Sequence, residues 1–339
     1  MERFQKQIAF EPLGSKGQEV LSRSKALVVG LGGLGSHVAE MLCRMGIGGL
    51  RLVDRDYVDV TNLHRQALYT EEDADQVRPK ALALRERLKS INSRVAVDGK
   101  VWHVDASNVT RLLKGVDVVI DGSDNLSLRF LLNEACVRAG KPLVFGAVAG
   151  SQGYAMAVLP GVTACLRCLL SQNTVPQPVR DTGLYPPTVR VTSALQCSLA
   201  VQALVRRKPE KAWAGRLHVL DVWSVEMEAI SVARRVGSDP CPVCVRGEFE
   251  WLSAEKPTGP QVIVDDDVVN ILPERKAEVD LNVIRARLQR VQHVKANEYL
   301  VWAQIGDVEM AVFRDGRMSV KGVGDWSEAV HLYERYLGE

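Results

Sequence analysis

The chain has 339 residues, of which 46% are hydrophobic and 25% are charged, and its formal net charge is +2 at pH 7. This length exceeds one average domain, so we expect one large domain and one small domain. A charge so close to neutral gives no bulk attraction to nucleic acid or to an acidic membrane. The sequence contains no run of 18 uncharged apolar residues, and its N-terminus does not resemble a signal peptide, which predicts a cytoplasmic protein.

Short apolar strands alternate with helical segments from residue 26 to residue 121, a pattern that predicts an α/β domain with a mostly parallel sheet. We expect strands at 26–29, 50–53, 95–101, 116–120, 142–145 and 153–159, and helices at 37–45, 79–92, 107–113, 126–139 and 189–205. The Pro- and Thr-rich loop 171–187 is long for a compact domain, so we expect it to contact substrate or to move.

A linker at 250–260 is expected to separate the large domain, 1–249, from a small α+β domain, 261–339. In this small domain we expect strands at 262–264, 299–305 and 309–314, and helices at 281–291 and 326–336. No catalytic constellation stands out in it, so its role is unassigned.

A glycine-rich turn follows the first expected strand and precedes the first expected helix, with Gly30, Gly32, Gly33 and Gly35. Here Gly30 permits a tight turn, Gly32 lets the backbone approach a phosphate or ribose, and Gly35 lets the helix lie against the strand. Asp54, at the end of the next strand, is placed to bind ribose hydroxyls. This Rossmann-like pattern alone leaves hydride, methyl and nucleotidyl transfer open.

Polar residues downstream of the turn favour nucleotidyl transfer. Asn62, Arg65 and Lys80 would bring an amide and two cations to its mouth, which suits a polyphosphate whose charge grows as pyrophosphate leaves. The alternative is that they are ordinary surface residues.

The seven cysteines include two C-x-x-C pairs, Cys165 with Cys168 and Cys241 with Cys244. Thiols in a cytosolic chain are reduced, so these spacings predict a metal site in which four thiolates hold one tetrahedral zinc ion. Two unrelated thiol pairs or a redox dithiol are the alternatives. The other three cysteines fall in apolar helical patterns and are expected to be buried.

Taken together, these motifs resemble the ThiF/MoeB/HesA family of adenylyltransferases, relatives of the ubiquitin-activating (E1) enzymes, over roughly residues 1–249. The segments that carry the resemblance are 3–7, 30–35, 54–56, 62–66, Lys80, 123–125 and the two cysteine pairs. The resemblance implies an E1-like adenylation domain that uses ATP to activate the C-terminal Gly-Gly of a ubiquitin-like sulfur-carrier protein. The products would be an acyl-adenylate and pyrophosphate, for molybdopterin or thiamine biosynthesis or tRNA thiolation.

The same resemblance implies roles for individual residues. Arg65 and Lys80 would neutralise the phosphates, Asn62 would hydrogen-bond them, and Asp54 would hold the ribose. Asp124 would bind Mg²⁺, a hard cation that prefers carboxylate oxygens. The implied nucleotide site also includes Asp56 and Asn125. Asp121 and Asp124 could instead cap the helix that begins near residue 125. The zinc would be structural, because four thiolates leave no open coordination position.

An N-terminal R-x-x-R-like element reaches the partner subunit's site in this family, which implies a homodimer. Here Arg3 is followed by Lys6, so either residue could supply that cation. Many relatives carry a cysteine in the crossover loop, but segment 179–183 has none. We therefore predict that the enzyme stops at the acyl-adenylate and that a separate sulfurtransferase supplies sulfur. Two alternatives stay open, an NAD-dependent oxidoreductase and a non-catalytic adaptor that binds a ubiquitin-like protein.

Overall fold

The computed structural model describes residues 2–170, 183–206, 213–253, 260–265, 268–274, 278–288, 291 and 293–338. The chain divides into two compact units. The first comprises Met1–Asp56, Val60–Thr70 and Pro79–Ala254, and the second comprises Tyr57–Asp59, Glu71–Arg78 and Glu255–Glu339.

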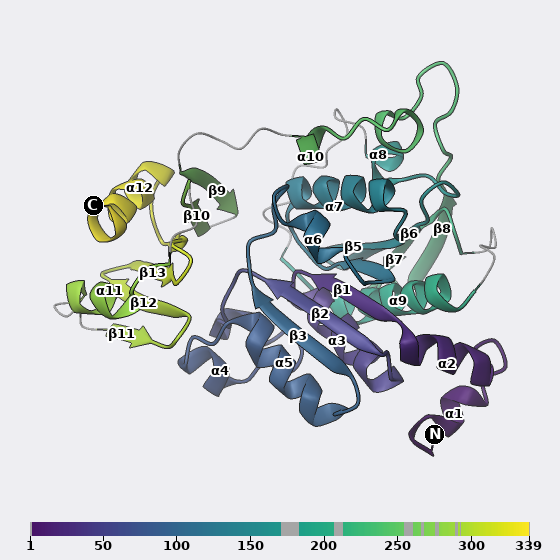
Figure 1. Ribbon diagram of the computed structural model, residues 1–339, viewed down its shortest axis with the longest axis horizontal. Helices are drawn as coiled ribbons and strands as arrows, with labels where there is room; N and C mark the ends of the chain where they lie inside the picture. Colours follow the sequence, from purple (N-terminus) through teal and green to yellow (C-terminus); the bar gives the residue numbers. More distant parts are fainter. Residues whose placement is uncertain are drawn as a thin grey trace. The chain divides into compact units, whose positions relative to one another are not determined.

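The first unit is built on an eight-stranded sheet with the order β3-β2-β1-β4-β5-β6-β7-β8 (Figure 1). Its strands are β1 (Lys25–Val29), β2 (Gly49–Asp54), β3 (Ala96–Val101), β4 (Val118–Asp121), β5 (Leu143–Ala149), β6 (Gln152–Val158), β7 (Arg216–Asp221) and β8 (Glu226–Ser231). Pairing is parallel from β3 through β5 and antiparallel from β5 through β8. The predicted mixed α/β class with a mostly parallel sheet is confirmed.

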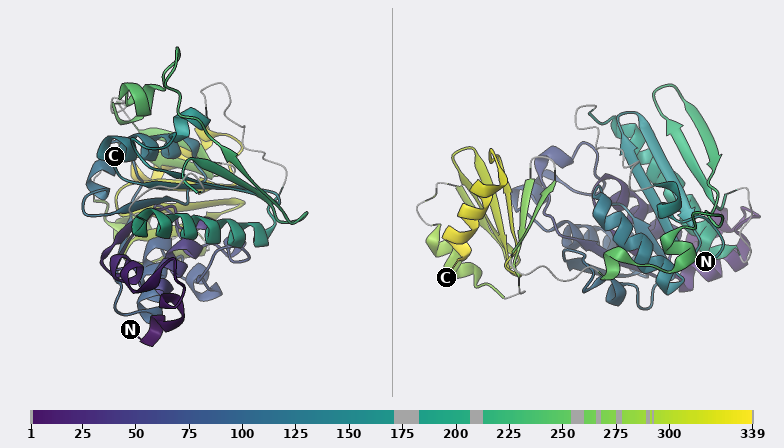
Figure 2. Two further views of the ribbon diagram at one scale, coloured as in Figure 1. Left: turned by 90° about the vertical axis from the view of Figure 1, so that its right-hand side faces the viewer. Right: turned by 90° about the horizontal axis from the view of Figure 1, so that it is seen from above.

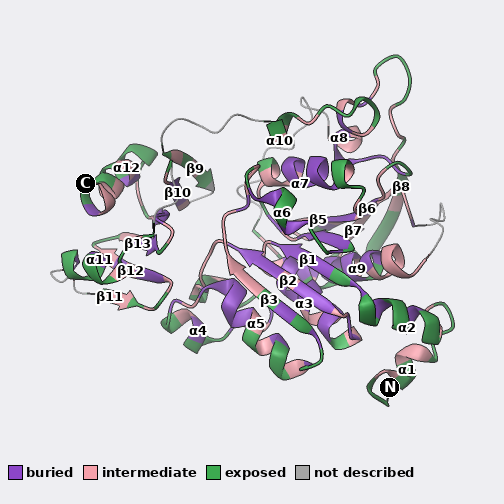
Figure 3. Cartoon of the chain, viewed as in Figure 1, coloured by how far each residue is buried: buried purple, intermediate pink, exposed green. Residues whose placement is uncertain are grey.

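Helices cover both faces of this sheet (Figure 2). On one face lie α3 (Gly33–Met45), α5 (Lys80–Ile91) and α9 (Pro186–Val205), and on the other lie α6 (Val109–Leu112) and α7 (Leu126–Ala139). Shorter elements are η1 (Glu2–Phe4), α1 (Gln5–Ile8), α2 (Gly14–Arg23), η2 (Val60–Asn62), α8 (Leu166–Leu169), the π-helical turn η4 (Pro242–Arg246) and α10 (Glu250–Ser253). The central strands are buried between these layers (Figure 3), which is why they read as continuous apolar runs.

Helix α3 begins at Gly33, four residues before its expected start at His37, so two of the motif's glycines lie in its first turn. A Cβ at Gly35 would stand 1.8 Å from the carbonyl oxygen of Gly30. Gly30 itself has a φ of +80°, which favours glycine. The helix therefore starts close against the strand end because these positions carry no side chain.

The sequence does not predict strands β7 and β8. Both contain polar and charged residues that interrupt the apolar pattern. Residues 250–253, which we expected in the linker, form α10 and pack on α7: Trp251 stacks on Phe130, and the Leu252 amide donates to Glu134. Residues 250–253 therefore pack as part of the first unit.

Helix α9 is the one helix among the described residues with the length and apolar composition of a membrane span. It packs against α3 and against β4, β5 and β6, and Gln196 and Ser193 on this buried side make hydrogen bonds inside the unit. This packing buries half of the apolar stretch of the helix.

The second unit contains a six-stranded antiparallel sheet with the order β11-β12-β13-β14-β10-β9. Its elements are α4 (Glu71–Asp75), β9 (Gln261–Asp265), β10 (Val268–Leu272), α11 (Leu281–Arg287), β11 (His293–Ala296), β12 (Leu300–Ile305), β13 (Val308–Phe313), β14 (Met318–Lys321) and α12 (Trp326–Leu337). The sequence pattern predicts β9, β12, β13, α11 and α12 but not the three other strands. Within this unit, Asn297 donates to the carbonyls of Gln76 and Val77, and Lys295 pairs with Asp75 at 2.8 Å.

Candidate nucleotide site and cysteine cluster

The predicted nucleotide-binding residues come from three neighbouring parallel strands. Val29 of β1 lies in register with Val53 of β2 and with Asp121 of β4. The glycine turn, Asp54 and the segment after Asp121 therefore emerge at one edge of the sheet, the carboxyl edge where open α/β sheets bind ligands.

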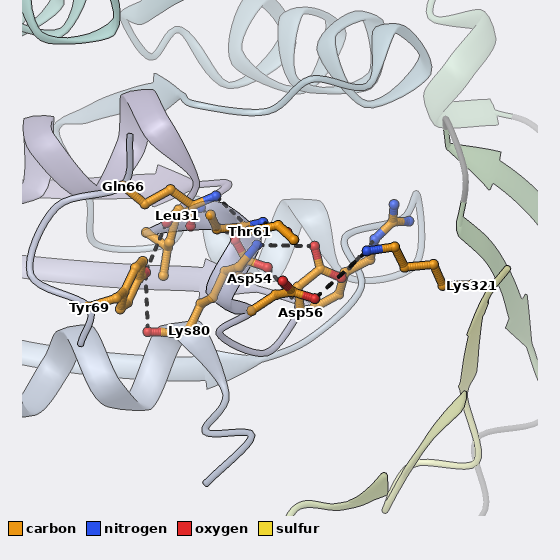
Figure 4. A network of polar contacts seen from close by, with 11 residues as sticks. Leu31, Asp54, Asp56, Thr61, Gln66, Tyr69, Lys80 and Lys321 are labelled. Atoms are coloured by element: carbon orange, nitrogen blue, oxygen red, sulfur yellow. Dashed lines mark hydrogen bonds and ion pairs between the residues drawn. The ribbon is translucent and has the colours of Figure 1, made fainter. Parts of the chain in front are cut away.

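Asp54 is buried and its carboxylate is held by backbone amides. One oxygen accepts a 2.6 Å hydrogen bond from Leu31 in the glycine turn, and the other accepts a 2.8 Å bond from Asp56 (Figure 4). Burial raises the pKa of Asp54, while the charge of Lys80 opposes this rise. The structure thus gives Asp54 a role in holding the glycine turn, and its binding of ribose stays a prediction.

Lys80 is the first residue of α5, and its side chain is buried at the same edge. Its Nζ lies 3.5 Å from an Asp56 carboxylate oxygen, and its amide donates to the Asp56 carbonyl. Burial would lower the pKa of Lys80, but the charges of Asp56, Asp54 and Asp124 outweigh it and raise that pKa. Lys80 therefore carries a positive charge throughout the neutral range, as a cation held among carboxylates.

The segment that follows η2 lies against the glycine turn. Gln66 approaches Gly32, and the Arg65 carbonyl approaches Gly33. The Asn62 side chain accepts a 2.7 Å hydrogen bond from Gln66, and Arg65 donates to the Thr61 carbonyl at 2.9 Å. Gln66 and the Arg65 backbone thus lie beside the turn, and the binding of phosphate by Asn62 and Arg65 stays a prediction.

Tyr69 and Gln66 make contacts in the site that the sequence pattern does not predict. The Tyr69 hydroxyl donates to the Leu31 carbonyl at 2.9 Å, so the glycine turn is held through Leu31 from two sides (Figure 4). The Gln66 side chain orients Asn62. The position of Gln66 next to Arg65 is a sequence signal that could have indicated its role. No such signal lies near Tyr69.

Asp124 follows β4 and is exposed, and its charge acts on Lys80. Asn125 is the N-cap of α7, where its side chain accepts a 2.9 Å bond from the Leu128 amide. The side-chain cap of α7 is therefore Asn125, and not Asp121 or Asp124 as the capping alternative had it. The Asp124 carboxylate lies at the surface, where its charge acts on Lys80.

Arg3 and Lys6 lie in η1 and α1, both exposed. The Arg3 charge acts on Cys43, and the Phe4 ring stands where a Cβ of Gly46 would be, so this segment packs at the C-terminal end of α3. The glycine turn is at the other end of α3, which at 13 residues is about 20 Å long. Neither residue is positioned to serve the site of its own chain.

The four cysteines of the two C-x-x-C pairs converge, with all four sulfur atoms within 4.8 Å of one another. Cys165 and Cys241 are 3.8 Å apart, and Cys168 and Cys244 are 3.5 Å apart. A tetrahedral zinc with bonds of about 2.3 Å places its sulfur ligands about 3.8 Å from one another. The cluster is formed by the segments around α8 and η4, and it packs with the core beneath α7.

The remaining three cysteines, Cys43, Cys136 and Cys197, are buried. Burial raises the pKa of the Cys43 thiol to about 11 and that of Cys197 to about 12, so they are unreactive at neutral pH. Positions 179–182 of the crossover loop lie outside the described residues.

Comparison with protein-family models matches residues 4–243 to the ThiF family. The chain belongs to the ThiF family. It is 36% identical over 338 residues to the sulfur carrier protein ThiS adenylyltransferase of Bacillus subtilis, and the match covers 99% of each chain. It is 35% identical to a sulfur carrier protein adenylyltransferase of Thermus thermophilus, over 72% of this chain and 90% of the relative.

Solved structures confirm the fold of this ThiF-family chain. Escherichia coli MccB with ATP superposes with a TM-score of 0.61 and 21% identity, covering 72% of this chain and 74% of that one. The predicted resemblance to the ThiF/MoeB/HesA adenylyltransferases is thereby confirmed. The hydride-transfer alternative, which rested on the glycine turn and Asp54 alone, finds no support in this family membership.

Proposed function

We propose that the chain adenylates the C-terminal carboxylate of a ubiquitin-like sulfur-carrier protein, using ATP and releasing pyrophosphate. The observation that carries the proposal is the convergence at one sheet edge of the glycine turn, the buried cation Lys80 and the exposed carboxylate Asp124. The relatives named adenylyltransferases of sulfur-carrier proteins support it.

In this reaction a carrier carboxylate oxygen bonds to the α-phosphorus as the bond from that phosphorus to the pyrophosphate oxygen breaks. The carboxylate is already ionised at neutral pH, since an α-carboxyl has a pKa of about 3.5. No proton has to be removed, so the site needs no general base. Its residues have to reduce repulsion between two anions and hold them in line.

The residues divide this work between them. The glycine turn allows the nucleotide to approach the backbone, and Arg65 and Lys80 would neutralise phosphate charge as pyrophosphate leaves. Asn62, oriented by Gln66, would donate to a phosphate oxygen. The Asp56 carboxylate stays beside Lys80 and keeps it protonated.

The donor set also fits Mg²⁺. Asp124 offers an exposed carboxylate at the phosphate side of the site, the ligand type and the partial access to water that this ion requires. A bound Mg²⁺ would supply Lewis-acid chemistry, withdrawing negative charge from the phosphates. Asp124 would hold it, and Lys80 would contact phosphate.

Four further features belong to the proposal. The cysteine cluster would hold a structural zinc ion, and the enzyme would act in the cytoplasm. Arg3 or Lys6 would complete the site of a partner subunit in a homodimer, which accords with their place at the far end of α3. A separate sulfurtransferase would act after the acyl-adenylate forms, because the crossover loop has no cysteine.

Among sulfur carriers, we propose a ThiS-type protein as the substrate. The Bacillus subtilis relative, which is named an adenylyltransferase of ThiS, matches across 99% of both chains. Carriers of the molybdopterin and tRNA-thiolation type are the alternatives that the experiment has to separate.

The test is ATP/pyrophosphate exchange with Mg²⁺, run with ThiS-type and MoaD-type carriers from the same organism. We expect exchange that requires a ThiS-type carrier and falls at least about 100-fold in Asp124→Ala. Asp98→Ala is the matched control, because Asp98 is an exposed aspartate on β3 that pairs with Arg51 and Lys100. Thermal protection by NADH without protection by MgATP, or tight ATP binding without exchange, would contradict the proposal.

A further inference from the structure

Asp121 ends β4 as a fully buried carboxylate. One of its oxygens accepts hydrogen bonds from both the amide and the hydroxyl of Ser123, at 2.9 and 2.6 Å. Its backbone carbonyl accepts a 2.9 Å bond from Gln196 of α9. These bonds fix the short turn that leads directly into Asp124.

Arg129 holds the same turn from the first part of α7. It donates from Nη2 to the Ser123 carbonyl at 2.6 Å, and its Nε lies 3.6 Å from the second carboxylate oxygen of Asp121. Its guanidinium also stands over the Phe145 ring, 5.1 Å from the centroid. One planar cation therefore spans the two residues on either side of Gly122, a geometry that the flexible point charge of lysine reproduces poorly.

The turn also packs on the nucleotide-binding turn. A Cβ on Gly30 would meet the Gly122 carbonyl and the Ser123 amide at 2.8 Å, and the Gly122 amide donates to the Val29 carbonyl. Backbone touches backbone here, so a shift of the turn cannot be absorbed by a side-chain rotation. The position of Asp124 is thereby set relative to the glycine turn.

We propose that Asp121 and Arg129 form a positioning pair that aims Asp124 at the Mg²⁺ of bound MgATP. This inference rests on the proposed function. Asp121 is fully buried and Arg129 is engaged with the turn, so both act through Asp124 and neither is a catalytic residue. Outer partners of this kind orient metal ligands and tune the affinity of the site.

The charges support this arrangement. Burial raises the pKa of Asp121, and the neighbouring Arg129 cation opposes that rise, as do the bonds from Ser123. Replacing Arg129 would leave the buried carboxylate without its cation and the Ser123 carbonyl without its donor. The turn would then lose two of the contacts that fix the position of Asp124.

The test compares Arg129→Met, which keeps length but no donors, with Arg129→Lys and Asp121→Asn. Arg138→Met is the matched control, because Arg138 lies on the same helix with its guanidinium on Thr110 at the exposed side. Calorimetric titration of ATP into the full-length, carrier-free protein, over a range of Mg²⁺ concentrations, reports metal binding without catalysis. Mn²⁺ bound in the presence of ATP, read by electron paramagnetic resonance, gives a second measure.

We expect Arg129→Met to weaken the binding of Mn²⁺ in the ATP complex by about tenfold. The same variant should keep its Mg²⁺-free ATP affinity within about twofold, because Asp54 and Tyr69 still hold the glycine turn through Leu31. In carrier-dependent exchange, the half-saturating Mg²⁺ concentration should rise by a similar factor, with the rate recovering at high Mg²⁺. Arg129→Lys and Asp121→Asn should fall between wild type and Arg129→Met.

A lower melting temperature with unchanged Mg²⁺ and Mn²⁺ dependence would show a purely structural pair and overturn the proposal. If Arg129→Met does not fold, Arg129→Lys decides by the same measurements. The wild type could show no exchange with any carrier while Arg129→Met loses the metal-dependent ATP binding of the wild type. In that case the proposed function fails and the positioning pair stands. If exchange is lost in Asp124→Ala but keeps its wild-type metal dependence in Arg129→Met, the proposed function stands and the positioning pair fails.

Discussion

The carboxylate of Asp54 accepts a 2.6 Å hydrogen bond from the backbone amide of Leu31, and thereby ties the end of β2 to the glycine turn after β1. Both groups are buried, and the second carboxylate oxygen is engaged by the Asp56 amide. An acidic residue at this point of a Rossmann-like sheet is expected to meet a ribose. Here it also builds the turn on which the nucleotide would lie.

Replacing Asp54 by alanine should therefore lower stability as well as ATP affinity. Leu31 and Asp56 would lose their acceptor, and a buried amide left without a partner costs about 1–3 kcal/mol. Urea unfolding measures this loss. Asp98→Ala, an exposed aspartate in the adjacent strand, should change the free energy of unfolding by less than about 0.5 kcal/mol. Equal effects of the two substitutions would contradict this view of Asp54.

Gly35→Ala should destabilise the first unit, because the new Cβ would lie 1.8 Å from the Gly30 carbonyl oxygen. Backbone has to move to relieve this contact, so we expect a loss of about 3 kcal/mol, at the upper end of overpacking costs. Gly237→Ala is the control, since a Cβ there meets nothing within 4 Å. Chemical denaturation measures both variants, and an unchanged midpoint for Gly35→Ala would refute the close approach.

The cysteine cluster should bind one zinc ion per chain, and chelation should lower the melting temperature before it affects the chemistry of folded molecules. Four thiolates close the zinc coordination shell, so the ion contributes to folding alone. Metal analysis should find zinc lost in Cys168→Ser and retained in Cys136→Ala, whose sulfur is buried elsewhere in the core. A folded, metal-free protein that has lost only adenylation would contradict a structural role.

Helix α12 should become less protected at acidic pH through its N-cap, Asp325. Hydrogen bonds from the Ser327 hydroxyl and from the amides of Glu328 and Ser327 lower the pKa of this carboxyl below its ordinary 3.8. An acid with a lowered folded-state pKa contributes stability above its unfolded pKa and loses it as the pH falls through the folded value. Hydrogen exchange of α12 amides in wild type and Asp325→Ala should differ at pH 7 and converge below that value. A constant difference between the two proteins would exclude the charge as its cause.

Local sequence patterns are sufficient to predict an element wherever residues close together in the chain decide its structure. The apolar run of β1 followed by glycines predicts the strand, the turn and α3, and the two C-x-x-C spacings predict a four-thiolate cluster that the fold does assemble. The cap of α12 is local in the same way, because Asp325 accepts hydrogen bonds from the amides two and three residues after it. In each case the interacting groups lie within one turn, or their chemistry narrows the possible partners.

Tertiary structure alone decided contacts between residues far apart in sequence. Nothing in the pattern around Asp54 indicates that its partner is Leu31, or around Gln196 that it reaches the carbonyl of Asp121, 75 residues away. Strands β7 and β8 escape prediction for the same reason, since a half-exposed strand owes its stability to the neighbours that accept its hydrogen bonds. The sequence by itself determined the family, the glycine turn and the two cysteine pairs that converge in one cluster. Tertiary packing brings together groups that are far apart in the sequence, and it alone decided which hydrogen bonds hold those residues.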